Sequence, residues 1–522
     1  MLEHDVMMTN PAVSMTKPEG HARPFKARKY IAFLLALIFS GICLVMSANA
    51  VLTGSGLLAL FWLIPLPFIL WAIFYPKWTL ACLVALIFWL PGPIDHFWDI
   101  HVSPYPTADL TRFLSLLDVF VVMAWLWLPR VKDSKQKATE IWVGILLVIL
   151  TAYSACNVLW QSDRLDPFRA QSLWIGLLPL RLLIVYWLVR KALHRLEDVY
   201  RLYLGLAIGV VGLLANSAYK TLLGESMAGR VVAGTFGNNV FSVLLALMIV
   251  LLQMLRKYLR VTWLKWVITG LQVTCFVFIL FSDTRMAFGL LVLGLGMLFL
   301  LQPRYSTGFV VRLTWSGILA VMILGVLLMA VGAMEINTFD RVALMLKAVS
   351  GQASASEMDM ALGTANVRLV FWQFALDRLA ESPWFGIGPG QWNYERTRSD
   401  NRHLYAPNGS VDAISDPHNG FIYMAVEYGW PSLAMYGAVL LICILVGAKT
   451  LRQSKALLGG WSEARQVYDL AAGLLVIALM LALGHLTNTY INSLYTQIFV
   501  GLIFFTLLRT GTVLRNEYLY NR

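Results

Sequence analysis

The sequence predicts an all-α, polytopic membrane protein, and three observations lead to that class. Of the 522 residues, 59% are hydrophobic and 13% are charged, and the mean hydropathy is +0.68. Apolar runs of about 20 residues, the length that spans a bilayer as a helix, recur along most of the chain. The lysines and arginines gather in short clusters between these runs. Together these features exclude a soluble protein.

About fourteen apolar runs are predicted as transmembrane helices, the third being the shortest. They lie near residues 31–52, 57–75, 78–91, 112–128, 141–159, 173–189, 200–219, 239–255, 264–282, 286–302, 313–333, 420–447, 469–486 and 495–510. The predicted organisation is a cytoplasmic N-terminal tail, eleven helices, a periplasmic loop, three helices and a cytoplasmic C-terminal tail. The boundaries of these parts are 1–30, 31–333, 334–417, 418–510 and 511–522.

The basic clusters predict the orientation of the chain. With the N-terminus in the cytoplasm, nearly all lysines and arginines of the short loops fall on the cytoplasmic side, as the positive-inside rule requires. The largest clusters lie at 130–137, 190–195, 256–265 and 449–465. The net charge of +12 is therefore interpreted as a topological signal and not as a nucleic-acid-binding surface. The first run is too long for a cleavable signal, so we expect it to remain as a helix.

The cysteines predict neither a disulfide nor a zinc site. Cys43, Cys82, Cys156, Cys275 and Cys443 lie in or beside apolar runs, far apart and without metal-ligand spacing. Such cysteines pack as small apolar side chains. No paired carboxylates mark a metal site either, so we expect a reaction that uses no metal and no cofactor.

The long polar insertion at 334–417 contains one predicted helix and one predicted turn. The helix runs from Val367 to Ser382, with apolar residues at three- and four-residue spacing that would lie on the membrane or on the bundle. These apolar residues are Val370, Phe371, Phe374, Ala375 and Leu379. The sequence from Gly386 to Gly390 is glycine-rich, but no βαβ unit surrounds it and Pro389 removes a backbone donor. We therefore interpret it as a structural turn.

The insertion ends at Asp416-Pro417-His418-Asn419-Gly420, immediately before the apolar run at 420–447. In one interpretation this is a capped helix entry, in which Asn419 or Asp416 caps the helix. In the other, His418 is a titratable base at the outer membrane face, hydrogen-bonded by Asp416 or Glu427. Together with the arginines described next, the functional interpretation is favoured.

Two arginines lie in loops on the predicted outer side, where the charge rule does not require them. Arg230 is followed by glycines and asparagines up to Asn239, which favours a shaped anion site over an arginine that merely reaches the interface. Arg285 lies in a short turn and is either an anion ligand or an interfacial arginine balanced by Asp283. Arg181, inside the run at 173–189, is costly there unless it is paired or faces water, and is a weaker candidate.

Four segments, taken in their order along the chain, resemble the O-antigen ligase and polymerase superfamily of bacterial inner-membrane glycosyltransferases. The segments are Arg230 with Gly234 to Asn239, Ser282 to Arg285, Arg368 to Gly390, and His418-Asn419 followed by Glu427 and Gly429. Two short motifs of this chain differ from the sequences usual in the family. The chain has Asp283-Thr284-Arg285-Met286 where Ser-Arg-Gly/Ser is usual, and Gly237-Asn238-Asn239 where Asn-Pro-Asn is usual.

The resemblance implies a GT-C-like membrane enzyme that takes a glycan from undecaprenyl diphosphate and passes it to an acceptor hydroxyl with inversion. By the same resemblance, His418 is the catalytic residue and Arg230 and Arg285 bind the diphosphate. Asp416, Asn419, Glu427 and Arg368 would support them. The expected location is the bacterial inner membrane, with the active site facing the periplasm and both termini in the cytoplasm. The expected partners are the lipid-linked donor, a glycan or lipid A–core acceptor, membrane lipids and a chain-length regulator protein.

Several functions are compatible with these features. A polymerase of a surface polysaccharide is favoured, because the chain is long and departs from the motif forms associated with ligases. An O-antigen ligase and a protein O-glycosyltransferase are alternatives within the same superfamily. A transporter or flippase is the alternative from another class, although no hydropathy repeat relates the two halves and the candidate charges gather at the outer face and not at the midplane.

Overall fold

The structure, a computed structural model, describes the following parts of the chain. The described residues are 23–52, 63–89, 116–128, 138–161, 178–222, 238–259, 261–282, 284–301, 347, 354, 368–369, 371–392, 395, 417–458, 462–487 and 494–520. Regular secondary structure within them is helical throughout. The chain is thus an all-α membrane protein, as predicted.

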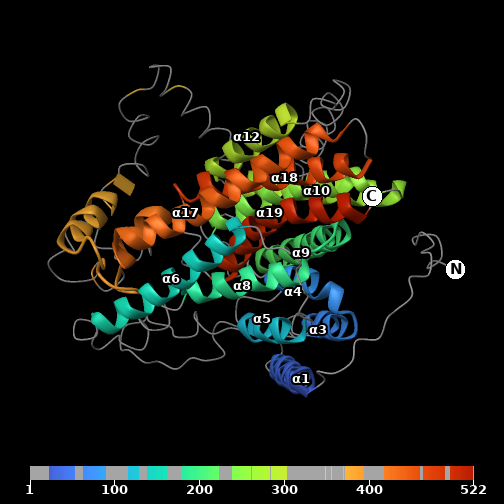
Figure 1. Cartoon of the computed structure of the whole chain (residues 1–522), viewed down its shortest axis with the longest axis horizontal. Coiled ribbons are helices and arrows are strands. Elements are labelled where there is room, and N and C mark those ends of the chain that lie inside the picture. The colour runs from blue at the N-terminus through green and yellow to red at the C-terminus, as the bar shows by residue number, and fades with distance from the viewer. Residues whose placement is uncertain are drawn as a thin grey trace.

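The principal helices, shown in Figure 1, follow one another along the chain. They are α1 (Arg23–Leu52), α3 (Pro65–Phe74), α4 (Thr79–Trp89), α5 (Leu116–Trp127), α6 (Ala138–Trp160), α8 (Leu178–Ala192), α9 (Leu196–Leu222), α10 (Asn238–Tyr258), α11 (Thr262–Phe281), α12 (Arg285–Leu301), α17 (Gly420–Ala456), α18 (Ser462–Gly484) and α19 (Leu494–Tyr520).

Each predicted run except 313–333, which lies outside the described residues, overlaps one of these helices. Seven of them, α6, α9, α10, α11, α17, α18 and α19, are long and apolar enough to cross a membrane, which makes this a multi-pass membrane protein. The count of fourteen crossings remains a prediction. The segment predicted as a C-terminal tail, 511–522, is helical as far as Tyr520.

The helices form one bundle with α19 at its centre. Every residue of α19 from Thr496 to Leu514 is buried, and the helix packs against α8, α17 and α18. The short helix α4 is also buried, from Thr79 to Phe88, mainly against α9. This close contact requires glycine on α9, because a Cβ atom at Gly205 would overlap the carbonyl oxygen of Ala81.

The two ends of the bundle have different chemistry. One end, called here the His418 end, contains the end of α6, the start of α17 and the end of α18. The other, called the basic end, contains the start of α6, the turn between α8 and α9, and the start of α18. At the basic end Lys257 of α10 is paired with Asp469 of α18, and the Tyr468 hydroxyl donates to the carbonyl oxygen of Leu301.

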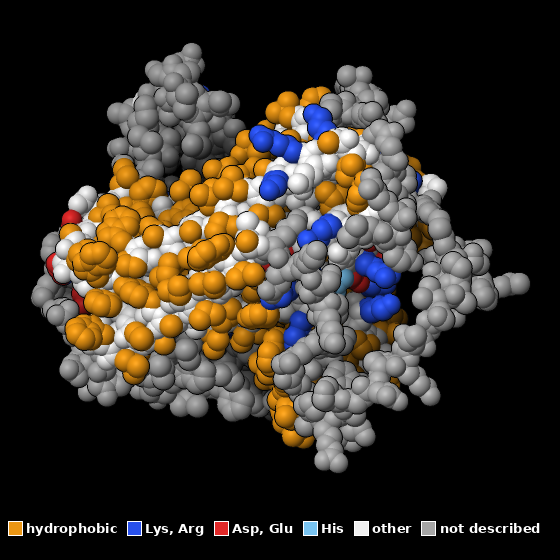
Figure 2. All heavy atoms as spheres, viewed as in Figure 1, with side chains coloured by type: hydrophobic (Ala, Val, Ile, Leu, Met, Phe, Trp, Pro, Cys, Tyr) orange, Lys and Arg blue, Asp and Glu red, His pale blue; other side chains and the backbone are white. Residues whose placement is uncertain are grey.

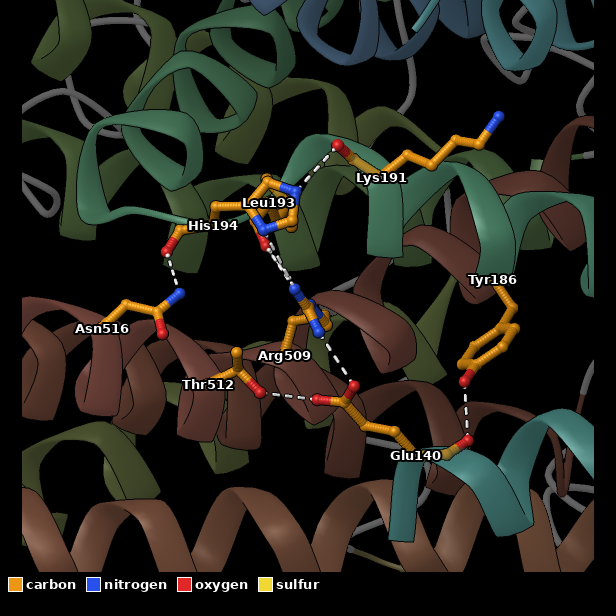
Figure 3. Close-up of polar contacts among 8 residues, drawn as sticks. All are labelled: Glu140, Tyr186, Lys191, Leu193, His194, Arg509, Thr512 and Asn516. Atoms are coloured by element: carbon orange, nitrogen blue, oxygen red, sulfur yellow. Dashed lines mark hydrogen bonds and ion pairs between the residues drawn. The ribbon is translucent and has the colours of Figure 1, made fainter. Parts of the chain in front are cut away.

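A buried ion pair between Glu140 and Arg509 ties three segments together at the basic end (Figure 3). Arg509 Nη1 lies 2.8 Å from Glu140 Oε2, and the Thr512 hydroxyl donates to Glu140 Oε1 at 2.6 Å. The guanidinium also donates to the Leu193 carbonyl oxygen, at 3.2 Å from Nε and 3.1 Å from Nη2. Both charged side chains are 1–2% exposed. Because the ions are desolvated but well hydrogen-bonded, removing one of them leaves a costly unpaired charge.

We predict that Arg509→Leu destabilises the protein, by about 3–5 kcal/mol, because it leaves the Glu140 carboxylate buried without its partner. Thermal unfolding of the purified protein in detergent measures the change. Arg452→Leu, at an exposed position of α17, is the control and should have little effect. Glu140→Leu combined with Arg509→Leu should recover part of the loss. Equal stability of the Arg509 and Arg452 variants would contradict a stabilising role for the pair.

Candidate functional site

The candidate site at the His418 end is built from the start of α17 and a segment that packs against it. This segment, residues 371–392, is called the cap; it consists of a helix at 371–381 followed by turns (Figure 1, beside the start of α17). The predicted amphipathic helix is confirmed for its described residues. Its buried side chains, Phe371, Phe374 and Ala375, pack with Trp392 and with residues of α17. The apolar face therefore lies against the bundle, one of the two placements that the sequence left open.

The cap fits into a break in α17. The predicted run at 420–447 is helical but not continuous, because Gly429 has φ 81° and ψ 168°. A side chain at this position would overlap the carbonyl oxygen of Trp384 in the cap. The next residue, Trp430, donates its backbone N–H to the Pro383 carbonyl oxygen at 3.0 Å. Pro431 follows in the first turn of the second part of the helix, where its missing N–H costs nothing.

Glu427 holds the glycine-rich turn of the cap. Its Oε2 accepts a hydrogen bond from Gly390 N at 2.9 Å, and its Oε1 accepts one from Trp392 N at 3.1 Å. The backbone of Ile387 also donates to the Val426 carbonyl oxygen, at 2.8 Å. The segment from Gly386 to Gly390 is thus a structural turn, as predicted. Since the carboxylate is 1% exposed and accepts two charge-assisted hydrogen bonds, it fastens the cap to α17.

The end of α6 holds the same turn from its other side. Asn157 Nδ2 donates to the Phe385 carbonyl oxygen at 2.7 Å, and Gln161 Nε2 donates to the same oxygen at 3.1 Å. The Phe385 ring stacks on Tyr153 and Trp160, with ring centroids 5.9 and 6.0 Å apart. We did not predict these contacts from the sequence. The available signal was the pair Asn157 and Gln161, two amides four residues apart at the end of an apolar run, which share one helix face.

His418 lies immediately before α17 with a left-handed backbone, at φ 49°. This conformation costs a residue with a side chain roughly 1–2 kcal/mol, so the surroundings must hold it. Asn419 caps the helix, as one interpretation of the sequence predicted: its Oδ1 accepts from Phe421 N at 3.0 Å and Ile422 N at 3.1 Å. Such strained conformations occur often at functional sites, and this one fixes the direction in which the imidazole leaves the backbone.

Both neighbours of the His418–Asn419 unit are held by other segments. On one side, the indole Nε1 of Trp372 in the cap donates to the Pro417 carbonyl oxygen at 2.9 Å. On the other, Gly420 N donates to the carbonyl oxygen of His485, just after α18, at 2.7 Å. The His418 side chain itself is half-buried. The chain therefore presents a partly accessible imidazole from a backbone that is tied down before and after it.

His485 has a different character because it is buried and fully engaged. Its Nδ1 lies 2.7 Å from the Leu481 carbonyl oxygen and its Nε2 lies 2.9 Å from the Tyr436 hydroxyl. A carbonyl oxygen only accepts, so Nδ1 carries the proton and Nε2 accepts from the tyrosine. Burial lowers the pKa of His485 to about 4, against an opposing effect of the hydrogen bond to Leu481. It is thus a neutral structural residue.

The remaining predicted site residues lie at the same end or outside the described residues. Arg230 and Asp416 are outside them. Arg285 is the first residue of α12. The starts of α10 and α12 adjoin here, since the Ser242 hydroxyl donates to the Thr284 hydroxyl at 3.1 Å. The structure thus brings the helix that follows the Arg230 loop next to the turn that contains Arg285.

Two further residues lie close to the cap and α17. Arg368 is helical and half-buried, four residues before Trp372, and in a helix that spacing puts two residues on one face. Arg181 is half-buried in α8, which packs against α6, the helix whose end holds the cap. Among the described residues, no group of three or more His, Cys, Asp or Glu side chains is arranged to hold a metal ion.

Comparison with known protein families identifies part of this chain. Residues 270–437 match the family model described as O-antigen ligase. The match begins in α11, contains Arg285, the cap and His418, and ends in α17 after the break at Gly429. Arg230 precedes it. A comparison with curated proteins gave no match.

We predict that Gly429→Ala detaches the cap from α17, because the new methyl group meets the Trp384 carbonyl and the backbone there is left-handed. Hydrogen–deuterium exchange should rise in peptides covering 371–392 while the other helices stay protected. Gly437→Ala is the matched control on the same helix, since a Cβ there meets nothing within 4 Å. Unchanged exchange of the cap in the Gly429 variant would refute this role of the break.

We predict that acidification destabilises the protein partly through His485. The pKa of His485 in the folded protein, about 4, lies below the ordinary value of 6.5. The contribution of neutral His485 to the free energy of unfolding is therefore complete above pH 6.5 and is lost as the pH falls toward 4. Thermal unfolding at pH 7 and pH 5 should show a larger fall for the wild type than for His485→Gln, which has no imidazole to protonate. The same fall in both proteins would show that other groups account for it.

Proposed function

We propose that this chain belongs to the O-antigen ligase and polymerase superfamily, which the match of residues 270–437 to an O-antigen ligase model supports, and that it transfers a glycan from undecaprenyl diphosphate to a sugar hydroxyl in the periplasm. The favoured reaction is polymerisation of a surface polysaccharide. The observation that carries the proposal is His418, a half-buried imidazole on a strained, tied-down backbone within the matched region. The O-antigen ligase type of function rests on the family match; the donor, acceptor and roles of residues are our proposal.

The depth of the site in the membrane supports a lipid-linked donor. Trp142 and Trp160 of α6 are 59% and 76% exposed, and tryptophans on lipid-facing surfaces favour the two interfaces. They are 18 residues apart, or about 27 Å along a helix, close to the roughly 30 Å thickness of the hydrocarbon core. Because Phe385 of the cap stacks on Trp160, the cap lies at one interface. Lipid diphosphates present their charged groups at that height.

The distribution of charge supports a periplasmic site. Figure 2 shows the lysine and arginine side chains gathered over one part of the molecule, away from the cap. At the basic end, α8 and α10 finish with Arg190, Lys191, Arg256 and Lys257. By the positive-inside rule the basic end faces the cytoplasm, which puts His418 on the opposite side. We further propose that both termini lie in the cytoplasm and that the membrane is the bacterial inner membrane.

The proposed chemistry is a single displacement at the anomeric carbon of the donor sugar. The acceptor hydroxyl oxygen forms the new glycosidic bond as the bond from the anomeric carbon to the diphosphate oxygen breaks, with inversion. Sugar hydroxyls are far less acidic than imidazolium, so His418 takes the proton as the new bond forms and not before. Arg230 and Arg285 neutralise the charge that develops on the departing diphosphate. Arg368, Asp416, Asn419 and Glu427 support these groups.

A gel assay of glycan length separates the candidate reactions. The purified protein in nanodiscs is given one undecaprenyl-diphosphate oligosaccharide and no other acceptor. A ladder of longer glycans is expected and would establish a polymerase. Transfer that appears only after lipid A–core is added would instead establish a ligase. No transfer to either acceptor would overturn the proposal and favour a protein acceptor or a transporter.

We predict that His418→Ala and Arg230→Ala each abolish most of the transfer at an unchanged level of folded membrane protein. Loss of an assisting base typically costs about 10²–10⁴-fold in rate, and loss of diphosphate neutralisation should cost at least as much. The rate of ladder formation in nanodiscs measures both. Arg452→Ala, an exposed arginine on α17, is the control. Near-normal product from either site variant would remove that residue from the mechanism.

A further inference from the structure

We propose that Trp372 is a positioning residue for His418, acting through the carbonyl of Pro417. Its indole N–H holds the peptide unit that joins Pro417 to His418, and this fixes the direction of the imidazole. The inference rests on the proposed function insofar as His418 takes part in catalysis. The contact itself and its effect on the imidazole can be tested without any transfer reaction.

The conformation of His418 requires restraint from both sides. Among the residues that the structure describes, it is the only one other than glycine with a positive φ. After His418 the chain is fixed by Asn419, the N-cap residue of α17, and by the hydrogen bond from Gly420 N to the carbonyl oxygen of His485. Before it stands Pro417, which is buried and has no N–H, so the carbonyl is the only hydrogen-bonding group of its own backbone. Trp372 Nε1 binds that carbonyl oxygen at 2.9 Å.

Holding this oxygen acts directly on His418. A peptide unit is planar, so the Pro417 carbonyl and the His418 nitrogen move together. The angle φ of His418 describes the rotation between this plane and the rest of the residue. If the carbonyl is released, the plane can turn toward the more stable conformations with negative φ. The Cβ atom, and with it the imidazole, then points elsewhere even though Asn419 still caps the helix.

The cap is rigid enough to make Trp372 an effective restraint. The adjacent Phe371 is buried with Phe374 in the contact with α17, so the backbone of the cap helix is fixed at this point. The turn that follows is held by Glu427 and by the close approach at Gly429. Trp372 itself is only half-buried. The backbone that carries Trp372 is therefore fixed when its indole N–H binds the Pro417 carbonyl. The neighbouring Phe371 and Phe374 make most of the packing contacts of this helix with α17.

A second tryptophan of the cap allows the hydrogen bond to be separated from packing. Trp392 is 1% exposed, and its Nε1 has no hydrogen-bond partner in the structure. Trp392→Phe therefore removes part of an indole ring without removing a hydrogen bond. Trp372→Phe removes a less buried ring together with the bond to Pro417. If packing alone mattered, the Trp392 variant would be the more harmful of the two.

The experiment compares Trp372→Phe with Trp392→Phe in nanodiscs. Loss of one hydrogen bond of typical strength should lower kcat by roughly tenfold, with little change in KM, because the substrate still binds while the base is misdirected. Trp392→Phe leaves the hydrogen bond from Trp372 to Pro417 in place but removes packing beneath the cap helix, so kcat should fall less than in Trp372→Phe. The second readout is the rate at which diethyl pyrocarbonate modifies His418, followed by peptide mass spectrometry. It should change severalfold in the Trp372 variant alone.

The outcomes separate this proposal from the proposed function. Wild-type kcat and wild-type modification of His418 in Trp372→Phe would overturn the positioning role. A changed modification rate in a protein whose wild type transfers no glycan would support the contact and refute the function. If Trp372→Phe does not fold, replacing Trp372 by 3-benzothienylalanine, which keeps the ring shape but lacks the N–H, gives the same comparison. Equal effects in the Trp372 and Trp392 variants would also overturn the proposal.

Discussion

The break in α17 at Gly429 is the constraint on which the His418 end depends. A helix crossing a membrane normally satisfies its own backbone, and a break leaves polar groups that must find partners within the protein. Here the cap supplies them: Pro383 accepts from Trp430 N, and the carbonyl oxygens of Val426 and Glu427 accept from the backbone of Ile387 and Gly388. The break and the cap are therefore parts of one arrangement. The cap carries Trp372, which reaches back to the entry of the same helix.

The helix α6 connects this arrangement to the other end of the bundle. Its first turn carries Glu140, buried against Arg509. Asn157 in its last turn and Gln161 directly after the helix hold the cap. A straight helix of 23 residues spans about 34 Å, so α6 is a rigid rod between the two ends. Trp142 and Trp160, both exposed, lie near its two ends. Through α6, the buried ion pair at the basic end is connected to the cap at the His418 end.

The two histidines at the entry of α17 have distinct roles because their surroundings differ. His485 is completely buried, and both ring nitrogens are engaged, which keeps it neutral and makes its backbone carbonyl a stable partner for Gly420. His418 is half-buried on a left-handed backbone. Proton transfer requires an imidazole that can gain and lose a proton near a substrate, and burial of the kind seen at His485 opposes that. A fixed backbone with an accessible ring suits the role proposed for His418.

Much of the fold was predictable from local sequence, and the reason is physical. Apolar length predicts a spanning helix because the bilayer dictates it, and the placement of charges predicts direction. Local sequence also predicted three smaller features: the helix at 371–381, the turn at Gly386 to Gly390, and Asn419 as the N-cap residue of α17. Periodicity, glycine content and N-capping are properties of a few neighbouring residues. The same local reasoning selected His418 from its position at a helix entry. Its assignment as a catalytic residue remains a proposal.

Contacts between distant segments were decided only by the tertiary structure. Nothing near Glu140 in the sequence indicates a partner 369 residues away at Arg509, and nothing near Trp372 indicates that its indole meets Pro417. Glu427 was selected from the sequence as a supporting residue, and only the fold shows that its carboxylate accepts two hydrogen bonds from the cap, because it brings Gly390 and Trp392 to that point on α17. The break at Gly429 lies within an apolar run for which the sequence predicts one continuous transmembrane helix. Long-range packing, which a local pattern does not encode, makes that break possible and gives the site its shape.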